Sequence, residues 1–239
     1  MKTIGLLGGM SWQSTITYYR AINQIVRQKL GGQHSAKVII NSVDFDEIVK
    51  LQNDERWDAL AEILIDATKS LEHAGADLLV ICANTMHKVE PQISKACSIE
   101  IVHIADATAD TVIKAGIKNI GLIGTKYTME QEFYKGRLEK NHSLSVIIPN
   151  ETDRKIVHKV IYDELCYGQV IESSREEFKR IITSLKKEGA EGIILGCTEF
   201  GLLIHQDNVD LPIFDTTLIH ATSAVETALE SKTKSGMLT

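Results

Sequence analysis

The chain has 239 residues, a formal net charge of −6 and a hydrophobic content of 44%, which is the composition of an ordinary globular protein with room for one large domain or two small ones. The negative charge argues against nucleic-acid binding, which needs a basic face, and no apolar run approaches the roughly 20 residues that span a bilayer. The N-terminus leads into a strand-like segment without a signal-peptide core, so we expect a cytoplasmic protein with no nucleic-acid or membrane partner.

Short apolar runs alternate with longer amphipathic stretches along the first half, the rhythm of βαβ units and parallel sheets. Ser11, after the first run, is a predicted helix N-cap, and Gly75 is predicted to end a helix. The polar tail 231–239 is expected to fray. The predicted strands are residues 4–7, 38–43, 77–82, 99–104 and 120–124, and the predicted helices are residues 57–74 and 108–115.

The second half of the chain repeats the first. Ile4–Gly8 reappears as Ile120–Gly124, 116 residues later, and Gly75–Asp77 reappears as Gly189–Glu191, 114 residues later. Two matches in one order at nearly one offset predict two similar parallel-sheet α/β domains, related by pseudo-two-fold symmetry, with the active site in the cleft between them. The predicted domains are residues 1–105 with 216–239, and residues 106–215.

The repeat singles out two strand ends. Extending the second match places Ala83 over Cys197, each at the carboxyl end of a predicted strand. Ligands of open α/β sheets bind at these ends. Pseudo-symmetry would therefore place Ala83 and Cys197 on opposite walls of one cleft.

Cys197 is the candidate proton carrier. It enters a predicted helix, whose N–H groups and positive end would favour a thiolate, and a thiolate beside a substrate Cα can act as a general base. The alternative is a buried structural cysteine, the role we expect for Cys97 and Cys166. The cysteines show no CxxC spacing for zinc or redox chemistry.

Polar residues follow both strand ends: Asn84 and Thr85 in the first half, Thr198 and Glu199 in the second. Their N–H, hydroxyl and amide groups suit a bound carboxylate, although plain helix capping would explain the same residues. Glu199 can instead orient a partner or accept hydrogen bonds from a substrate ammonium group.

Nucleotide and metal sites lack support in the sequence. The glycine-containing segments Gly8-Gly9 and Gly124-Thr125 are turn signals that can let a ligand approach the backbone. Neither a GxGxxG motif nor a P-loop is present. The histidines His87, His103 and His220 lack metal-ligand spacing, and a structural or surface role is the commoner one for each.

Six further motifs are Gly8–Trp12, Ala83–His87, Gly124–Met129, Ile161–Leu165, Gly196–Glu199 and Leu211–Thr217. Together they resemble the aspartate/glutamate racemase family, over residues 4 to about 225. The resemblance implies two pseudo-symmetric α/β domains, a homodimer, an amino-acid or dicarboxylate ligand, and no pyridoxal phosphate, metal or other cofactor.

The resemblance also implies site residues. The family transfers protons with two cysteines that flank the substrate Cα, and Cys197 matches the second of them. Contacts to the substrate carboxylate match Asn84, Thr85 and Thr198. Residues that line the pocket match Met10, Gln52 and the Gly124–Thr128 loop, including Thr125 and Thr128.

Two features depart from the family pattern. Ala83 stands at the position of the first cysteine and cannot carry a proton, so racemisation is expected to be one-sided or impaired; the adjacent Cys82 should face the core. The segment 43–46 lacks the arginine that grips a distal carboxylate, leaving Gln52, Lys126 or a residue near Glu164 for that task.

Three functions therefore stay open: an aspartate/glutamate racemase, a single-cysteine decarboxylase of the same fold, and a non-catalytic dicarboxylate or amino-acid binding protein. Both enzymes would wash solvent deuterium into the substrate Cα, and a pure binding protein would not.

Overall fold

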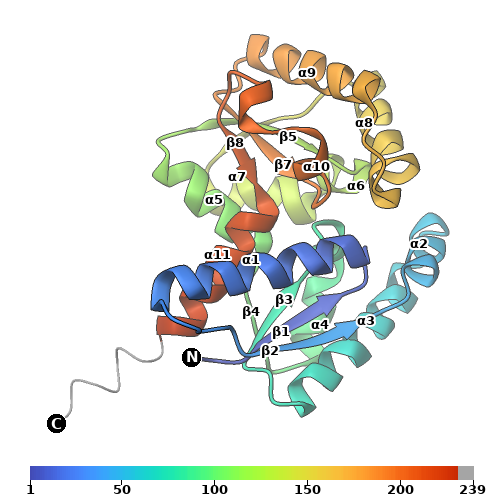
Figure 1. Ribbon diagram of the computed structural model, residues 1–239. Helices are drawn as coiled ribbons and strands as arrows, with labels where there is room; N and C mark the ends of the chain where they lie inside the picture. Colours follow the sequence, from blue (N-terminus) through green and yellow to red (C-terminus); the bar gives the residue numbers. More distant parts are fainter. Residues whose placement is uncertain (231–239) are drawn as a thin grey trace. The chain divides into compact units, whose positions relative to one another are not determined.

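Two separate four-stranded parallel sheets organise the chain, one in each of two units (Figure 1). The computed structural model describes residues 1–230, so the tail 231–239, expected to fray, lies outside the described residues. The first unit comprises residues 1–103 and the segment from 220 onward, and the second comprises residues 104–219. The predicted α/β fold with two similar parallel-sheet domains is confirmed.

The sheet of the first unit has the strand order β2-β1-β3-β4. Its strands are β1 (Ile4–Gly8), β2 (Val38–Ser42), β3 (Leu78–Ile81) and β4 (Glu100–Ile101). Its helices are α1 (Trp12–Leu30), α2 (Phe45–Asn53), α3 (Trp57–His73), the 3₁₀ helix η1 (Thr85–Val89), α4 (Glu90–Ala96) and most of α11 (Thr216–Glu230).

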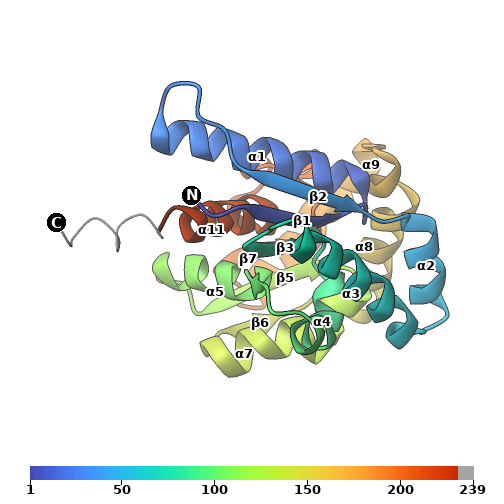
Figure 2. The same ribbon diagram turned by 90° about the horizontal axis from the view of Figure 1, so that it is seen from below.

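Helices cover both faces of this sheet, and β1 and β3 are wholly buried. Successive strand residues point to opposite faces, so Leu7 and Ile81 pack with α3, whereas Leu6 and Val80 pack with α1 and α11. Figure 2 shows α1 and α3 on opposite sides of the sheet. Burial on both faces explains why these strands are continuous apolar runs rather than alternating ones.

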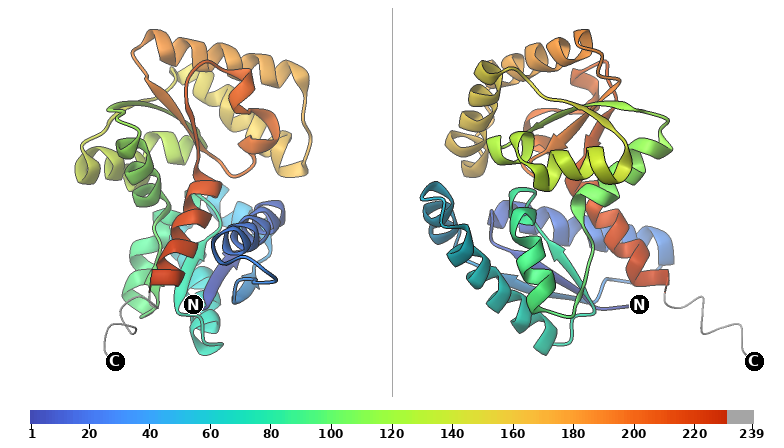
Figure 3. Two further views of the ribbon diagram at one scale, coloured as in Figure 1. Left: turned by 60° about the vertical axis from the view of Figure 1, so that its left-hand side comes forward. Right: turned by 180° about the vertical axis from the view of Figure 1, so that it is seen from behind.

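The second unit repeats this order as β6-β5-β7-β8. In Figure 3, α8 (Glu151–Asp163) and α9 (Glu172–Lys187), coloured yellow to orange, lie side by side against this sheet. Its strands are β5 (Asn119–Gly124), β6 (Ser145–Ile147), β7 (Gly192–Gly196) and β8 (Ile213–Asp215). Its helical segments are α5 (Ile104–Lys114), α6 (Lys126–Glu130), η2 (Glu132–Gly136), α7 (Arg137–His142), α8 (Glu151–Asp163), η3 (Leu165–Tyr167), α9 (Glu172–Lys187), α10 (Phe200–Leu203) and η4 (Gln206–Asn208).

The repeated Gly-Ala-acid motif performs the same task in both units. Asp77 Oδ2 accepts the N–H of Thr3 at 2.6 Å, and Glu191 Oε2 accepts the N–H groups of Lys118 and Asn119 at 3.0 and 2.8 Å. Each carboxylate thus ties the start of the third strand to the start of the first. The glycine two residues earlier has a positive φ in both copies, 91° and 102°, which requires a residue without a Cβ.

Most predicted elements are confirmed, but the fourth strand is not. Ser11 caps α1 by accepting the N–H of Ser14. The predicted strand 99–104 shrinks to Glu100–Ile101, and the predicted helix 108–115 begins earlier, at Ile104. A distant segment takes the place of a further strand partner: the Val102 carbonyl accepts a hydrogen bond from the His220 ring of α11 at 2.6 Å.

Candidate functional site

In the first unit, a tight turn follows β1. Gly9 has a φ of 91°, and a Cβ there would overlap the Val43 carbonyl oxygen. The Gly9 N–H donates to Thr15 Oγ1 at 2.9 Å, and that hydroxyl donates to the Ser11 carbonyl at 3.1 Å. Thr15, which the sequence did not single out, therefore holds the turn that carries Met10.

The end of β3 separates Ala83 from Cys82. Ala83 packs with Met10 and Met86 on the α3 side of the sheet, whereas Cys82 packs with Tyr18 on the α1 side. Burial raises the pKa of the Cys82 thiol. As predicted from strand alternation, Cys82 faces the core.

The other predicted site residues of this unit are buried polar groups. Asn84 and Thr85 are 4% and 6% exposed, directly after β3, and Gln52 is 1% exposed. Gln52 lies on the buried face of α2 with Ile48, which belongs to the same apolar cluster as Met10. These buried polar side chains therefore either follow Ala83 directly in the chain or share a helix face with a member of its apolar cluster.

In the second unit, the β5 end forms a hydroxyl-lined cap. Thr125 caps α6 by accepting the N–H of Thr128 at 3.2 Å, and their two hydroxyls lie 3.1 Å apart. Both residues are nearly inaccessible. Thr125 therefore caps a helix in addition to lying in a predicted turn. The capping alternative for the other strand ends finds no side-chain cap hydrogen bond at Asn84 or at Glu199.

The β7 end holds a thiol–carboxylate group. Cys197 Sγ donates to Glu199 Oε2 at 3.0 Å, and Thr198 Oγ1 donates to the same oxygen at 2.7 Å. Cys197 and Glu199 are 8% and 5% exposed. The Thr198 hydroxyl, predicted to contact a substrate carboxylate, donates to Glu199 in this state.

The expected stabilisation of a Cys197 thiolate is wrong for this state. Burial raises the pKa of the thiol well above its usual range, and the nearby Glu199 carboxylate adds to the rise. The helix that follows, Phe200–Leu203, has four residues, too short to offset these effects. Cys197 is therefore a protonated thiol beside a proton acceptor.

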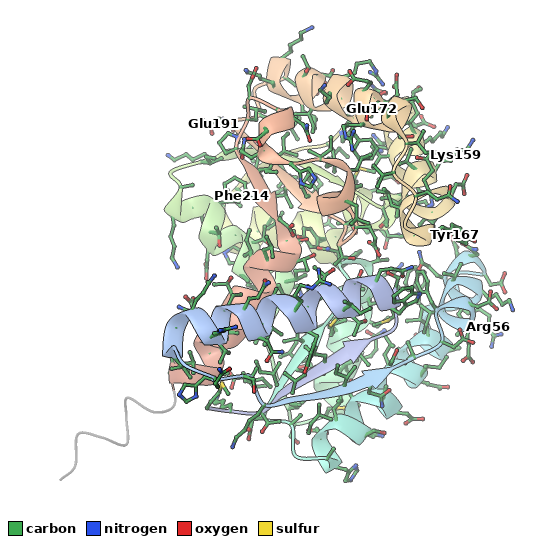
Figure 4. All side chains as sticks on the ribbon, in the orientation of Figure 1. Arg56, Lys159, Tyr167, Glu172, Glu191 and Phe214 are labelled. Atoms are coloured by element: carbon green, nitrogen blue, oxygen red, sulfur yellow. The ribbon has the colours of Figure 1, made fainter. Side chains whose placement is uncertain are left out.

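Cys166 belongs to the same neighbourhood, which the sequence did not suggest. It follows α8 in η3, next to Tyr167, which is 74% exposed and labelled in Figure 4. Burial, then the Glu199 charge, raises the pKa of the Cys166 thiol, and Cys166 in turn raises that of Cys197. The two cysteines are 31 positions apart in the chain, and the sequence held no signal of their proximity.

A mixed-charge pocket of about 300 Å³ is lined by residues of α6 and α8. It includes Lys126, one candidate for gripping a distal carboxylate, whose Nζ lies 4.8 Å from the Tyr127 ring centre.

Among the described residues, no cluster of histidine, cysteine and carboxylate groups could hold a metal ion. Within residues 1–230, no helix is both long and apolar enough to cross a membrane.

Comparison with known proteins yields one consistent result. The model of the Asp/Glu/Hydantoin racemase family matches residues 7–224. The chain is 53% identical to a putative Asp/Glu racemase from Yersinia pestis, with a TM-score of 0.89 over 96% of this chain and 100% of that one. It is 38% identical to an aspartate racemase homologue from Pyrococcus horikoshii, with a TM-score of 0.82 over 95% and 99%. A broad specificity amino-acid racemase from Bacillus subtilis is 23% identical, over 95% of this chain and 98% of the relative.

Proposed function

This chain belongs to the Asp/Glu/Hydantoin racemase family, and on that premise we propose that it is a cofactor-independent racemase of aspartate and/or glutamate. The observation that carries the proposal is the Cys197 thiol, which donates to the buried Glu199 carboxylate at the carboxyl end of β7. Membership of the family supports racemase chemistry, and we propose the substrate and the role of each residue in addition.

The thiol–carboxylate pair supplies the base. Glu199 accepts the Cys197 proton, and the resulting thiolate removes the substrate α-proton. The Cys197 pKa, raised by burial and by Glu199, makes the thiolate a stronger base once it forms, and protonation of Glu199 removes the charge that opposes it. The reverse transfer returns a proton to the same face of the carbanion.

Substrate binding is assigned to polar groups at the strand ends of both units. Asn84 and Thr85 would bind the α-carboxylate through N–H and side-chain donors, and the Thr125–Thr128 cap would line the pocket. When the hydrogen bond from Thr198 to Glu199 breaks, the Thr198 hydroxyl becomes available as a further donor to the substrate carboxylate.

Ala83 makes the proposed enzyme one-sided. The position that matches the family's first cysteine carries a methyl group, so the opposite face of Cα has no side-chain acid there. We expect exchange of the α-proton from the Cys197 face for one enantiomer, with slow interconversion in which a water molecule replaces the missing thiol.

The test is incorporation of deuterium at Cα from D₂O, followed by NMR for the L and D forms of aspartate and glutamate. Cys197→Ser should slow exchange by ~10²-fold or more, because a positioned acid/base group contributes ~10²–10⁴-fold. Cys97→Ser, a half-buried thiol of the first unit, is the matched control and should exchange at the wild-type rate.

The same assay separates the alternatives. Exchange retained above a tenth of the wild-type rate in Cys197→Ser would move the chemistry to another residue. Binding of aspartate without any exchange in the wild-type protein would favour the non-catalytic binding protein. Loss of CO₂ from a malonate-type substrate would favour the single-cysteine decarboxylase.

A further inference from the structure

Three imidazole rings lie buried together in the first unit. His87, His103 and His220 are 1%, 7% and 0% exposed, and the His87 ring centre lies 4.6 Å from that of His103 and 5.7 Å from that of His220. They come from three distant segments: η1, the residue before α5, and α11. Burying polar rings is costly unless they are hydrogen-bonded, so such a cluster calls for a role.

Hydrogen bonds define the protonation of two of these rings. A carbonyl oxygen can only accept, so His220 Nε2, 2.6 Å from the Val102 carbonyl, carries a proton. Its Nδ1, 2.9 Å from the Tyr18 hydroxyl, accepts from that group in the neutral ring. His87 Nδ1, 2.9 Å from the Ala83 carbonyl, likewise carries a proton and donates to that oxygen.

The acceptor of the His87 bond lies at the proposed site. Ala83 begins the turn whose next two residues, Asn84 and Thr85, are assigned to the substrate carboxylate. A carbonyl held by a buried ring fixes the plane of the peptide between residues 83 and 84, and with it the direction of the N–H that the same peptide presents. His103 and His220 hold the His87 ring in place by packing against it.

Resting on the proposed function, we propose that His87 is a positioning residue for the substrate-carboxylate turn and that it acts through its hydrogen bond to the Ala83 carbonyl.

Burial favours the neutral form of the His87 ring. The titratable groups that share the apolar cluster or lie against the His87 ring include His103, His220, Tyr18 and Cys82. Burial first, then the two adjacent imidazoles, lowers the pKa of His87 well below its ordinary range. The neutral ring carries its proton on Nδ1, and that proton makes the hydrogen bond to the Ala83 carbonyl.

Two substitutions separate positioning from packing. His87→Asn places an amide N–H near the Nδ1 position and cannot titrate, whereas His87→Leu fills the space without a donor. His73→Leu, on the exposed end of α3, is the surface control. Each change is made in the Cys197→Ser background, so that L-aspartate binding is measured by calorimetry without turnover.

We expect His87→Leu to weaken L-aspartate binding about tenfold or more, the usual cost of leaving a buried acceptor without its donor. His87→Asn should recover most of this loss. His73→Leu should match the parent. ¹⁵N NMR of the parent should show His87 protonated at Nδ1 only.

Equal binding by His87→Leu and the parent, equal losses in the Asn and Leu variants, or a proton on His87 Nε2 at neutral pH would each overturn the inference. If L-aspartate binds and the pattern holds while the protein with Cys197 intact shows no exchange, the proposed racemase activity fails and the positioning role stands.

Discussion

Replacing Ala83 by cysteine should supply the proton carrier that the first unit lacks. Ala83 lies at the carboxyl end of β3, 6% exposed, with its methyl group packed against Met10 and Met86. Alanine has no transferable proton, whereas a thiol at this position would complete the pair that the family's proton transfer uses. The change adds a single sulfur atom.

Two magnitudes decide the outcome. A positioned acid/base group is worth ~10²–10⁴-fold in rate, which sets the expected gain in interconversion of enantiomers. Adding an atom to a packed site costs ~1–3 kcal/mol of folding stability. Because methionine side chains adapt to irregular gaps, we expect a cost near the lower end, small enough for the variant to fold.

The assay is chiral chromatography of wild-type protein and Ala83→Cys on L- and D-aspartate and L- and D-glutamate. Ala83→Ser, which is smaller and far less acidic than the cysteine variant, is the control and should gain little. Circular dichroism and a melting curve establish that each variant folds. The expected result is a gain of ~10²-fold or more with at least one amino acid.

The reasoning is refuted if Ala83→Cys folds, binds aspartate and gains nothing with any of the four substrates. Residue 83 and Cys197 would then not act on the same Cα, and the repeat that equates them would have structural meaning only.

Three further predictions concern other parts of the proposed site. Glu199→Gln should lower the pKa of the Cys197 thiol, since Glu199 raises it, and so speed alkylation of Cys197 by iodoacetamide. The same change should slow α-proton exchange by ~10²-fold, and unchanged exchange would exclude Glu199 as the proton acceptor. Burial lowers the pKa of His220 from 6.5 to about 4, so as the pH falls the unfolded chain binds a proton at this residue before the folded chain does. The contribution of neutral His220 to the free energy of unfolding is therefore full above about pH 6.5 and is lost toward pH 4, by up to ~1.4 kcal/mol per pH unit. Urea unfolding at pH 7.5, 6 and 5 measures that slope against His220→Asn, and parallel curves would contradict it. Gly8→Ala would place a Cβ 2.6 Å from Thr15 Oγ1, costing ~1–3 kcal/mol and weakening aspartate binding; an unchanged melting temperature would show that Thr15 can move.

The amino-acid sequence by itself determined the architecture, because the signals for it are local. Continuous apolar runs that recur after 114 to 116 residues predict two parallel sheets, and strand alternation correctly assigned Cys82 to the core. The carboxyl ends of β3 and β7 were also predictable, since each continuous apolar run stops there. None of these inferences needs a contact between distant residues.

Tertiary structure decided whatever depends on burial or on segments far apart in the chain. The helix-end argument predicted a thiolate at Cys197, but desolvation and the Glu199 carboxylate outweigh a four-residue helix. Likewise, three histidines without motif spacing became one cluster, because η1, the β4–α5 junction and α11 converge in the first unit. The group that each ring contacts, and hence the ring's protonation, depends on how distant segments of the chain pack together. No repeating pattern in the sequence indicates that packing.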